Sequence, residues 1–293
     1  MNGINELMSS LNIFERMLAF VLIAPLAGGV LAGIDRKLSA RLQGRYGPPV
    51  LQPFFDVFKL FRKERIIVNK FQDFTIVLFL LFTVFSGALF FSGADLLLTV
   101  FSLALAGTFF ILGGFCVGSP FSHLGAQREI LQMVAYEPMV ILMAVGMYQA
   151  TGSFKVAEIT NFQAPLVLWL PGVFAGFLYI LTIKFRKSPF DLSMSHHAHQ
   201  EIVRGITTEF SGPALVLIEI SHWYETVLLL GIVYLFFAFN PWLAFAVAAA
   251  AFLFEILIDM CYARFKWQLT FFSSWLFTAV AGVSNILVLS LMR

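Results

Sequence analysis

Acidic residues recur at helical spacing inside very apolar stretches of this chain. Glu219, His222 and Glu225 follow one another at three-residue steps within the apolar run 213–239. This spacing places the three side chains in one sector of a helix. Carboxylates close to one another and to a histidine acquire separated proton affinities and can pass protons. The pattern predicts a proton relay; the alternative is a set of internal ion pairs that hold helices together.

Other apolar runs carry carboxylates of the same kind. Glu137 lies about a turn and a half into the run 130–150, and Glu255 and Asp259 form an i, i+4 pair on one face of a later run. A charged group near the centre of a membrane helix costs about 2.5–3.5 kcal/mol on insertion scales, so each one needs an explanation. The candidate relay residues are Glu129, Glu137, Asp191, Glu201, Glu209, Glu219, His222, Glu225, Glu255 and Asp259.

The polar segment 184–212 also contains three histidines, and the chain has only two cysteines. Clustered loop histidines lack the outer ligand shell and geometry of a metal site, so a partner contact or a proton-accepting loop is favoured over a metal. Two isolated thiols exclude a disulfide framework, a zinc site and an iron–sulfur ligand set within this chain. Phosphate loops, nucleophile triads and nucleotide fingerprints are absent from the sequence. We therefore expect no catalytic, cofactor-binding or metal-binding residues here, and no nucleic-acid partner.

The composition decides which kind of element positions these residues. The chain has 293 residues, of which 59% are hydrophobic and 12% charged. A soluble domain has about a quarter of its residues charged, so this composition excludes a soluble protein. The apolar residues are spread almost evenly, which predicts a single polytopic membrane domain over residues 1–293. Residues 1–16 lack the basic start of a cleaved signal peptide.

A membrane-spanning helix needs about 20 mostly apolar residues. Eight runs meet this need: Met17–Ile34, Phe74–Ser92, Leu96–Cys116, Ile130–Ala150, Leu166–Ile183, Pro213–Phe239, Trp242–Tyr262 and Phe271–Leu291. The sequence thus predicts an all-α integral membrane protein with about eight transmembrane helices.

The basic residues predict how these helices are oriented. With eight spans and both termini on one side, the opposite side receives loops 35–73, 117–129, 184–212 and 263–270, which hold 16 of the 19 Lys and Arg residues. Basic loops stay in the cytoplasm. We therefore expect a multi-pass protein of the cell (cytoplasmic or inner) membrane with both termini outside.

A short amphipathic helix is expected near residues 50–63, after a Gly-Pro-Pro turn. Its apolar positions Leu51, Phe54, Phe55, Phe58 and Phe61 share one face. Such a helix lies in the membrane interface with its basic face toward the cytoplasm. It is either a generic interfacial helix or a docking platform for a cytoplasmic partner.

Four separated sequence blocks resemble those of the quinone-chamber subunit of respiratory complex I. They are "IDRKLSARLQGRYGPPVLQPFFDVFKLFRKE", "AYE" at 135–137, "SPFD" at 188–191 and "E-x-x-x-G-x-x-T-E-F-S-G" at 201–212. The acidic cluster that follows the PFD motif in quinone-reducing members is replaced here by "SMSHHAHQE". This segment, with "GAQRE" and "IEISHWYE", is similar to the membrane subunit of energy-converting, group 4 nickel–iron hydrogenases of the Ech type.

That resemblance implies a membrane subunit without redox centres in a ferredoxin-dependent hydrogenase complex that moves protons or sodium ions. Nickel–iron and iron–sulfur centres are then expected on partner chains: hydrogenase large and small subunits, a ferredoxin-like electron-transfer subunit and an antiporter-like membrane subunit. The residues expected to dock or couple these partners are Asp35, Arg36, Arg41, Arg45, Asp56, Lys59, Arg128, His196, His197 and His199. The rival interpretations are a quinone-site subunit of a complex I-like dehydrogenase, a standalone ion carrier or channel, and an inert structural anchor.

Overall fold

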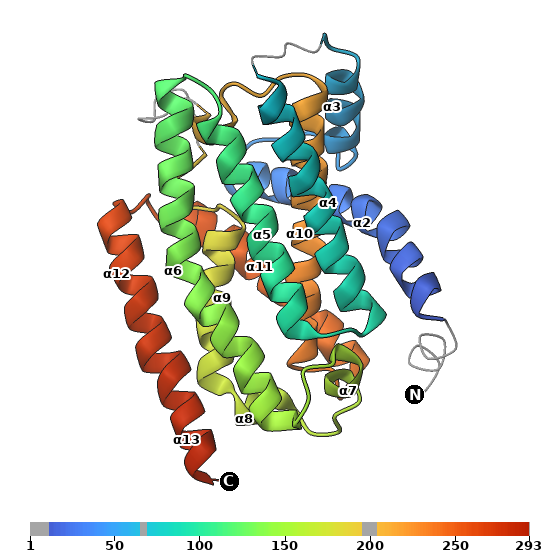
Figure 1. Cartoon of the computed structure of the whole chain (residues 1–293), viewed down its shortest axis with the longest axis vertical. Helices are drawn as coiled ribbons and strands as arrows, with labels where there is room; N and C mark the ends of the chain where they lie inside the picture. The colour runs from blue at the N-terminus through green and yellow to red at the C-terminus, as the bar shows by residue number, and fades with distance from the viewer. Residues whose placement is uncertain (1–11, 65–68, 195–203, 293) are drawn as a thin grey trace.

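The structure, a computed structural model, describes residues 12–64, 69–194 and 204–292, and it is almost entirely helical (Figure 1). Its long helices are α2 (Ile13–Leu42), α4 (Lys70–Ser92), α5 (Leu96–Phe115), α6 (Pro120–Thr151), α10 (Pro213–Leu235), α11 (Pro241–Cys261), and α12 (Trp267–Phe277) continued through the π-helical turn Thr278–Val283 into α13 (Ser284–Met292). The shorter helices are α3 (Gln52–Phe61), α7 (Val156–Thr160), α8 (Leu166–Trp169), α9 (Pro171–Lys184) and the 3-10 turn Gly205–Thr207. Seven of the described helices are long and apolar enough to cross a membrane. The prediction of an all-α integral membrane protein is confirmed.

The expected span 166–183 differs from the other seven because it is divided. Leu170 lies between α8 and α9 with φ −124° and ψ 46°, outside the helical region, and is followed by Pro171. Proline disfavours the helical conformation in the residue before it, which explains the break. The 14 residues of α9 rise only about 21 Å, at 1.5 Å per residue.

Helices α2 and α6 extend furthest beyond the spans predicted for them. Helix α2 continues past Ile34 to Leu42, and α6 begins at Pro120 rather than near residue 130. Asp35, Arg36 and Glu129 therefore lie on helices, which corrects their placement in loops. Hydropathy marks only the apolar part of a helix, whereas these charged turns have ion-pair partners elsewhere in the fold.

The helices form a bundle in which α4, α5, α6 and α10 run along its long axis (Figure 1). Stacked rings of Phe79 in α4 and Phe110 in α5, 5.0 Å apart, fill part of the core. The methionines at 139, 143 and 147 bring one face of α6 into the main core, which α9 also enters. The α12–α13 helix lies at the outer edge, with only 17% of its most apolar window buried.

The amphipathic helix is present as α3, at one end of the bundle (Figure 1). The sequence predicts that its apolar residues share one face, but in the structure they do not all have the same surroundings. The Phe54 ring packs against Trp223 of α10 at 5.2 Å, whereas Phe55, Phe58 and Phe61 are each at least 59% exposed. One side of α3 is thus anchored to the bundle, and the exposed phenylalanines are left for its surroundings.

Candidate functional site

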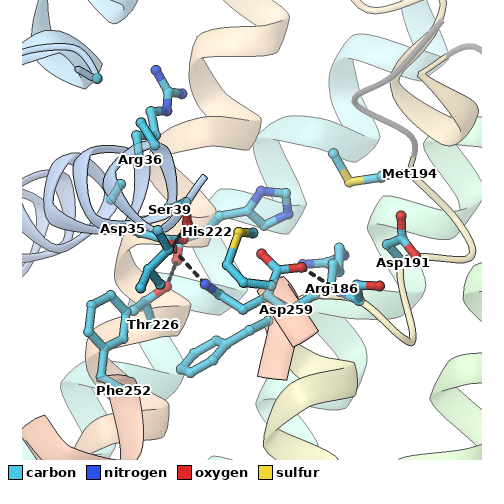
Figure 2. A pocket seen from close by; sticks show the side chains of 18 of the residues that line it. Asp35, Arg36, Ser39, Arg186, Asp191, Met194, His222, Thr226, Phe252 and Asp259 are labelled. Atoms are coloured by element: carbon cyan, nitrogen blue, oxygen red, sulfur yellow. Dashed lines mark hydrogen bonds and ion pairs between the residues drawn. The ribbon is translucent and has the colours of Figure 1, made fainter. Parts of the chain in front are cut away.

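A cavity of about 980 Å³ lies between α2, α10, α11 and the segment that follows α9. Its lining contains five carboxylates (Asp35, Asp191, Glu219, Glu225 and Asp259) and five basic side chains (Arg36, Arg45, Lys184, Arg186 and Lys187). Figure 2 shows Asp35, Arg186, His222, Thr226 and Asp259 gathered around this space. Ligand pockets are usually lined mainly by apolar groups. A cavity with this many charges suits water, protons and polar partner segments.

Arg186 joins two of the predicted relay residues. Its Nη2 atom lies 2.8 Å from Oε1 of Glu129 on α6, and its Nη1 atom lies 3.4 Å from Oε2 of Glu225 on α10. The side chains of these two glutamates are only 6% and 8% exposed. Burial opposes the charge of Arg186, yet attraction to Glu129 and Glu225 raises its pKa above the ordinary value. The guanidinium therefore stays charged and fixes the two carboxylates across the bundle.

The backbone of Arg186 is also unusual. Its φ of 51° lies in the left-handed region, which costs a residue other than glycine about 1–2 kcal/mol. Strained residues persist where surrounding contacts over-determine them, often at functional sites. Here the two ion pairs of the side chain supply those contacts.

Lys184, the last residue of α9, extends the row of charged side chains further into the bundle. Its Nζ atom lies 3.6 Å from Oε1 of Glu225 and 4.1 Å from the centre of the Tyr136 ring. Tyr136 is buried on α6, and Lys184 also attracts the neighbouring, partly buried Glu137. Ion pairs thus run from Glu129 through Arg186 and Glu225 to Lys184. Glu137 continues this row beside Tyr136 on α6 and interacts with Lys184 through its charge, without a direct ion pair.

Two further residues after α9 bind carboxylates on other helices. The Nζ atom of Lys187 lies 2.7 Å from Oδ1 of Asp35 on α2. The backbone N–H of Ser188 donates to Oδ1 of Asp259 on α11 at 2.8 Å. Three consecutive residues, 186–188, therefore contact α2, α6, α10 and α11, so a movement of this segment changes the surroundings of four carboxylates together.

His222 lines the same cavity, beside this row of charged residues. Its ring contacts Phe79 and Phe110 edge to face, with 5.8 Å between centroids in each case. Phe110 also lies 5.4 Å below the guanidinium of Arg186. Glu219, one turn earlier on α10, lines the cavity as well. The sixth apolar run therefore brings all three of its predicted residues to one site.

The predicted docking residues lie nearer the surface. Arg36 pairs with Asp56 of α3 at 2.6 Å, and the guanidinium of Arg41 lies 4.5 Å from the Tyr46 ring. Arg45 donates to Gln43 and lines the cavity, whereas Lys59 is exposed on α3. Arg36 and Arg45 therefore line the cavity, whereas Arg41 and Lys59 do not.

The segment that follows Asp191 is held by two arginines. Arg128 and Arg264 both donate to the carbonyl oxygen of Leu192, at 3.4 and 3.0 Å, and Arg264 also lies 3.7 Å from Asp191. Glu209 is half-buried between the 3-10 turn and α10 and does not line the cavity. Glu201, His196, His197 and His199 lie outside the described residues. Among the residues that are described, no group of three or more His, Cys, Asp or Glu side chains is placed to hold a metal ion.

Sequence reasoning missed the basic half of the site. Lys184, Arg186 and Lys187 were counted only as charges that orient the protein in the membrane. The signal was present, because carboxylates buried in a bundle require counter-charges. The run Lys-Phe-Arg-Lys directly after an apolar stretch supplies them.

Comparisons with known proteins agree on one family. The family profile described as NADH dehydrogenase matches residues 15–290. Hydrogenase-4 component C of Escherichia coli (strain K12) is 31% identical over 205 residues, and the match covers 64% of each chain, less than two thirds of that relative. Formate hydrogenlyase subunit 4 of the same organism is 32% identical over 221 residues, 70% of each chain.

Dehydrogenase subunits are similar to the same degree. An NADH-quinone oxidoreductase subunit of Rubrobacter xylanophilus is 33% identical over 220 residues, 66% of this chain and 65% of that one. A chain of the membrane-bound sulfane sulfur reductase, an archaeal respiratory membrane complex, superposes with a TM-score of 0.82. That match covers 93% of this chain and 99% of the other at 24% identity, and it shows the shared fold.

Proposed function

Because this chain belongs to the NADH dehydrogenase family, we propose that it is the membrane-anchoring and coupling subunit of an energy-converting hydrogenase complex. The observation that carries the proposal is the alternating row of buried charges that leads from the cavity into the bundle. Two of the relatives are hydrogenase-4 component C and formate hydrogenlyase subunit 4. In this role the chain couples one reaction, the transfer of electrons to protons to form hydrogen or its reverse, to the translocation of protons or sodium ions across the membrane.

The electron-carrying centres belong to partner chains in this proposal. Cys116 and Cys261 are the only cysteines, and both are free thiols. The nickel–iron centre and the iron–sulfur clusters are assigned to the hydrogenase large and small subunits and to a ferredoxin-like subunit. An antiporter-like membrane subunit receives the ion. The α3 end of the bundle faces the cytoplasm, and both termini lie outside.

Coupling runs through the segment after α9. Electron transfer in the docked partner moves residues 186–188, which bind carboxylates on four helices. When Arg186 shifts between Glu129 and Glu225, the proton affinity of the carboxylate that it leaves rises, because a nearby positive charge favours the ionised form. That carboxylate takes up a proton from water in the cavity, and the proton then moves along the row toward Glu137. His222, Glu209, Glu219, Glu255 and Asp259 are further members of this relay.

Purification of the native complex tests this assignment. The complex is isolated through an affinity tag on this chain, analysed for nickel, and assayed for hydrogen evolution from reduced ferredoxin. We expect a nickel-containing complex with ferredoxin-dependent hydrogen evolution. A complex without nickel that oxidises NADH with added quinone contradicts the proposal. Ion transport by this chain alone in liposomes identifies a standalone carrier.

A quinone-site subunit of a dehydrogenase complex is the second candidate. It is favoured by the match to the NADH-quinone oxidoreductase subunit of Rubrobacter xylanophilus and by the size of the cavity. The two candidates differ in the role of the cavity, which holds a quinone head group in one case and a partner segment with water in the other. Turnover that depends on added quinone and is blocked by quinone-site inhibitors supports the second candidate.

A further inference from the structure

Among the relay carboxylates that the structure describes, Glu255 on α11 is the one with both carboxyl oxygens buried and unpaired. It is 0% exposed, and neither of its carboxyl oxygens has an ion-pair partner or a well-formed hydrogen bond among the described residues. Its neighbours Phe252 and Ile256 are buried as well. Glu225, by contrast, has two basic partners. The two glutamates thus have similar burial and opposite surroundings.

An ionised carboxylate in such a place is very unfavourable. Burial of an isolated charge without a compensating partner is so costly that the group takes up a proton instead. The charged groups that act on Glu255 are Lys187, which pairs with Asp35, and Asp259, whose negative charge favours a neutral neighbour. The Thr182 hydroxyl of α9 lies beside it. These surroundings leave Glu255 as a neutral carboxylic acid.

Lys187 is placed to change that state. Its ammonium group contacts Asp35 at 2.7 Å and lies 5.9 Å from the ring of Phe252, three residues before Glu255 on the same face of α11. Asp259, one turn beyond Glu255 on that face, lines the cavity. A lysine between two carboxylates on different helices, one paired and one neutral, is the arrangement of a two-position switch.

We infer that Glu255 is a proton-storing site and that Lys187 is the cation that discharges it. In the resting state Glu255 holds the proton and Lys187 neutralises Asp35. When Lys187 moves from Asp35 to Glu255, the Glu255 O–H bond breaks and the proton passes to the Asp259 carboxylate, directly or through water. Asp259 then releases it into the cavity, so one proton leaves for each move of one positive charge. The storage site stands on the geometry alone, whereas its discharge rests on the proposed function.

Infrared spectroscopy of the whole purified complex tests the storage site. The carbonyl stretch of a protonated carboxylic acid is separate from carboxylate and amide absorption. We expect Glu255→Gln to remove one acid carbonyl band from the resting complex at neutral pH. The matched control Asp259→Asn, which changes a carboxylate that accepts a hydrogen bond and lines the cavity, removes carboxylate absorption instead.

Two results overturn the storage site. One is an unchanged acid carbonyl region in Glu255→Gln. The other is failure of both Glu255→Gln and Glu255→Met to assemble, because a neutral acid tolerates at least one neutral replacement of similar size. Neither result depends on ion transport, so the storage site and the proposed function fail separately.

The switch is tested by the difference between the reduced and oxidised complex. We expect reduction to weaken the Glu255 band in the unchanged complex and to leave it unaltered in Lys187→Gln. The double variant Asp35→Asn/Lys187→Gln removes both charges of the resting pair, and we expect the same result from it. A band that still weakens on reduction in either variant overturns the role of Lys187.

Discussion

The ion pairs inside the bundle and the ion pair at its surface have the same chemistry and different roles. Around Arg186, the paired side chains are 6–14% exposed and reach two helices at once. The Arg36–Asp56 pair, which links α2 to α3, is 43% and 39% exposed. Removing one partner of a buried pair leaves an uncompensated charge, whereas an exposed charge returns to water. The inner region therefore depends on its charges and the outer region does not.

What holds the outer region is close backbone packing. A Cβ atom on Gly33 of α2 would lie 1.7 Å from the carbonyl oxygen of Val50, just before α3. Phe54 adds its ring contact with Trp223 of α10. The turn that begins α3 is thus pressed directly onto α2, and any side chain at position 33 would have to displace the Val50 backbone.

The largest effect is expected from Arg186→Met. This change leaves Glu129 and Glu225 buried without the guanidinium, and it keeps the backbone strain at this position. We expect a loss of about 3–5 kcal/mol in the free energy of unfolding. Denaturant unfolding of the purified complex measures it. A loss below about 1 kcal/mol means that the inner pairs are no more important than surface pairs.

A smaller effect is expected from Gly33→Ala in the outer region. The added methyl group has to displace the Val50 backbone, and overpacking of this kind costs about 1–3 kcal/mol. Gly118→Ala is the matched control, since a Cβ atom there meets nothing within 4 Å. Equal melting temperatures for the two variants contradict the close contact between α2 and the start of α3.

The smallest effect is expected from Arg36→Met. Its pair with Asp56 is exposed, so the change costs about 0–1 kcal/mol and less at high salt, because salt screens exposed charges. Unfolding measured at low and high ionic strength tests both points. A loss as large as that of Arg186→Met removes the distinction between the two regions.

Much of the fold was predictable because a helix that crosses a membrane must be apolar along its length, and such apolar runs are visible in the sequence. The long helices appear where apolar runs of about 20 residues predict them. The predicted end of α2 and the predicted start of α6 were wrong, because the charged turns there are stabilised by ion pairs with residues distant in sequence. The break before Pro171 was visible in the sequence as a proline inside an apolar run. The sidedness of the loops stays a prediction.

The site was predictable in its acidic half only. Charges inside apolar runs are conspicuous, so Glu225 and Glu255 were both found. Their difference was not found, because the sequence does not show that Lys184 and Arg186 fold back onto Glu225, whereas Glu255 forms no ion pair with any described residue. Likewise, Phe54 shares a sequence pattern with Phe55 and Phe58, and only packing against Trp223 separates them.

The central claim is that the inner row of charges couples electron transfer to ion movement. The most direct test is the number of ions moved per hydrogen molecule formed, in liposomes that contain the complete complex with Glu137→Gln. The matched control is Glu158→Gln, a carboxylate of α7 in an exposed pair with Lys155. We predict that hydrogen formation continues in both variants and that ion movement falls at least tenfold in Glu137→Gln alone. An unchanged ratio in Glu137→Gln contradicts the account.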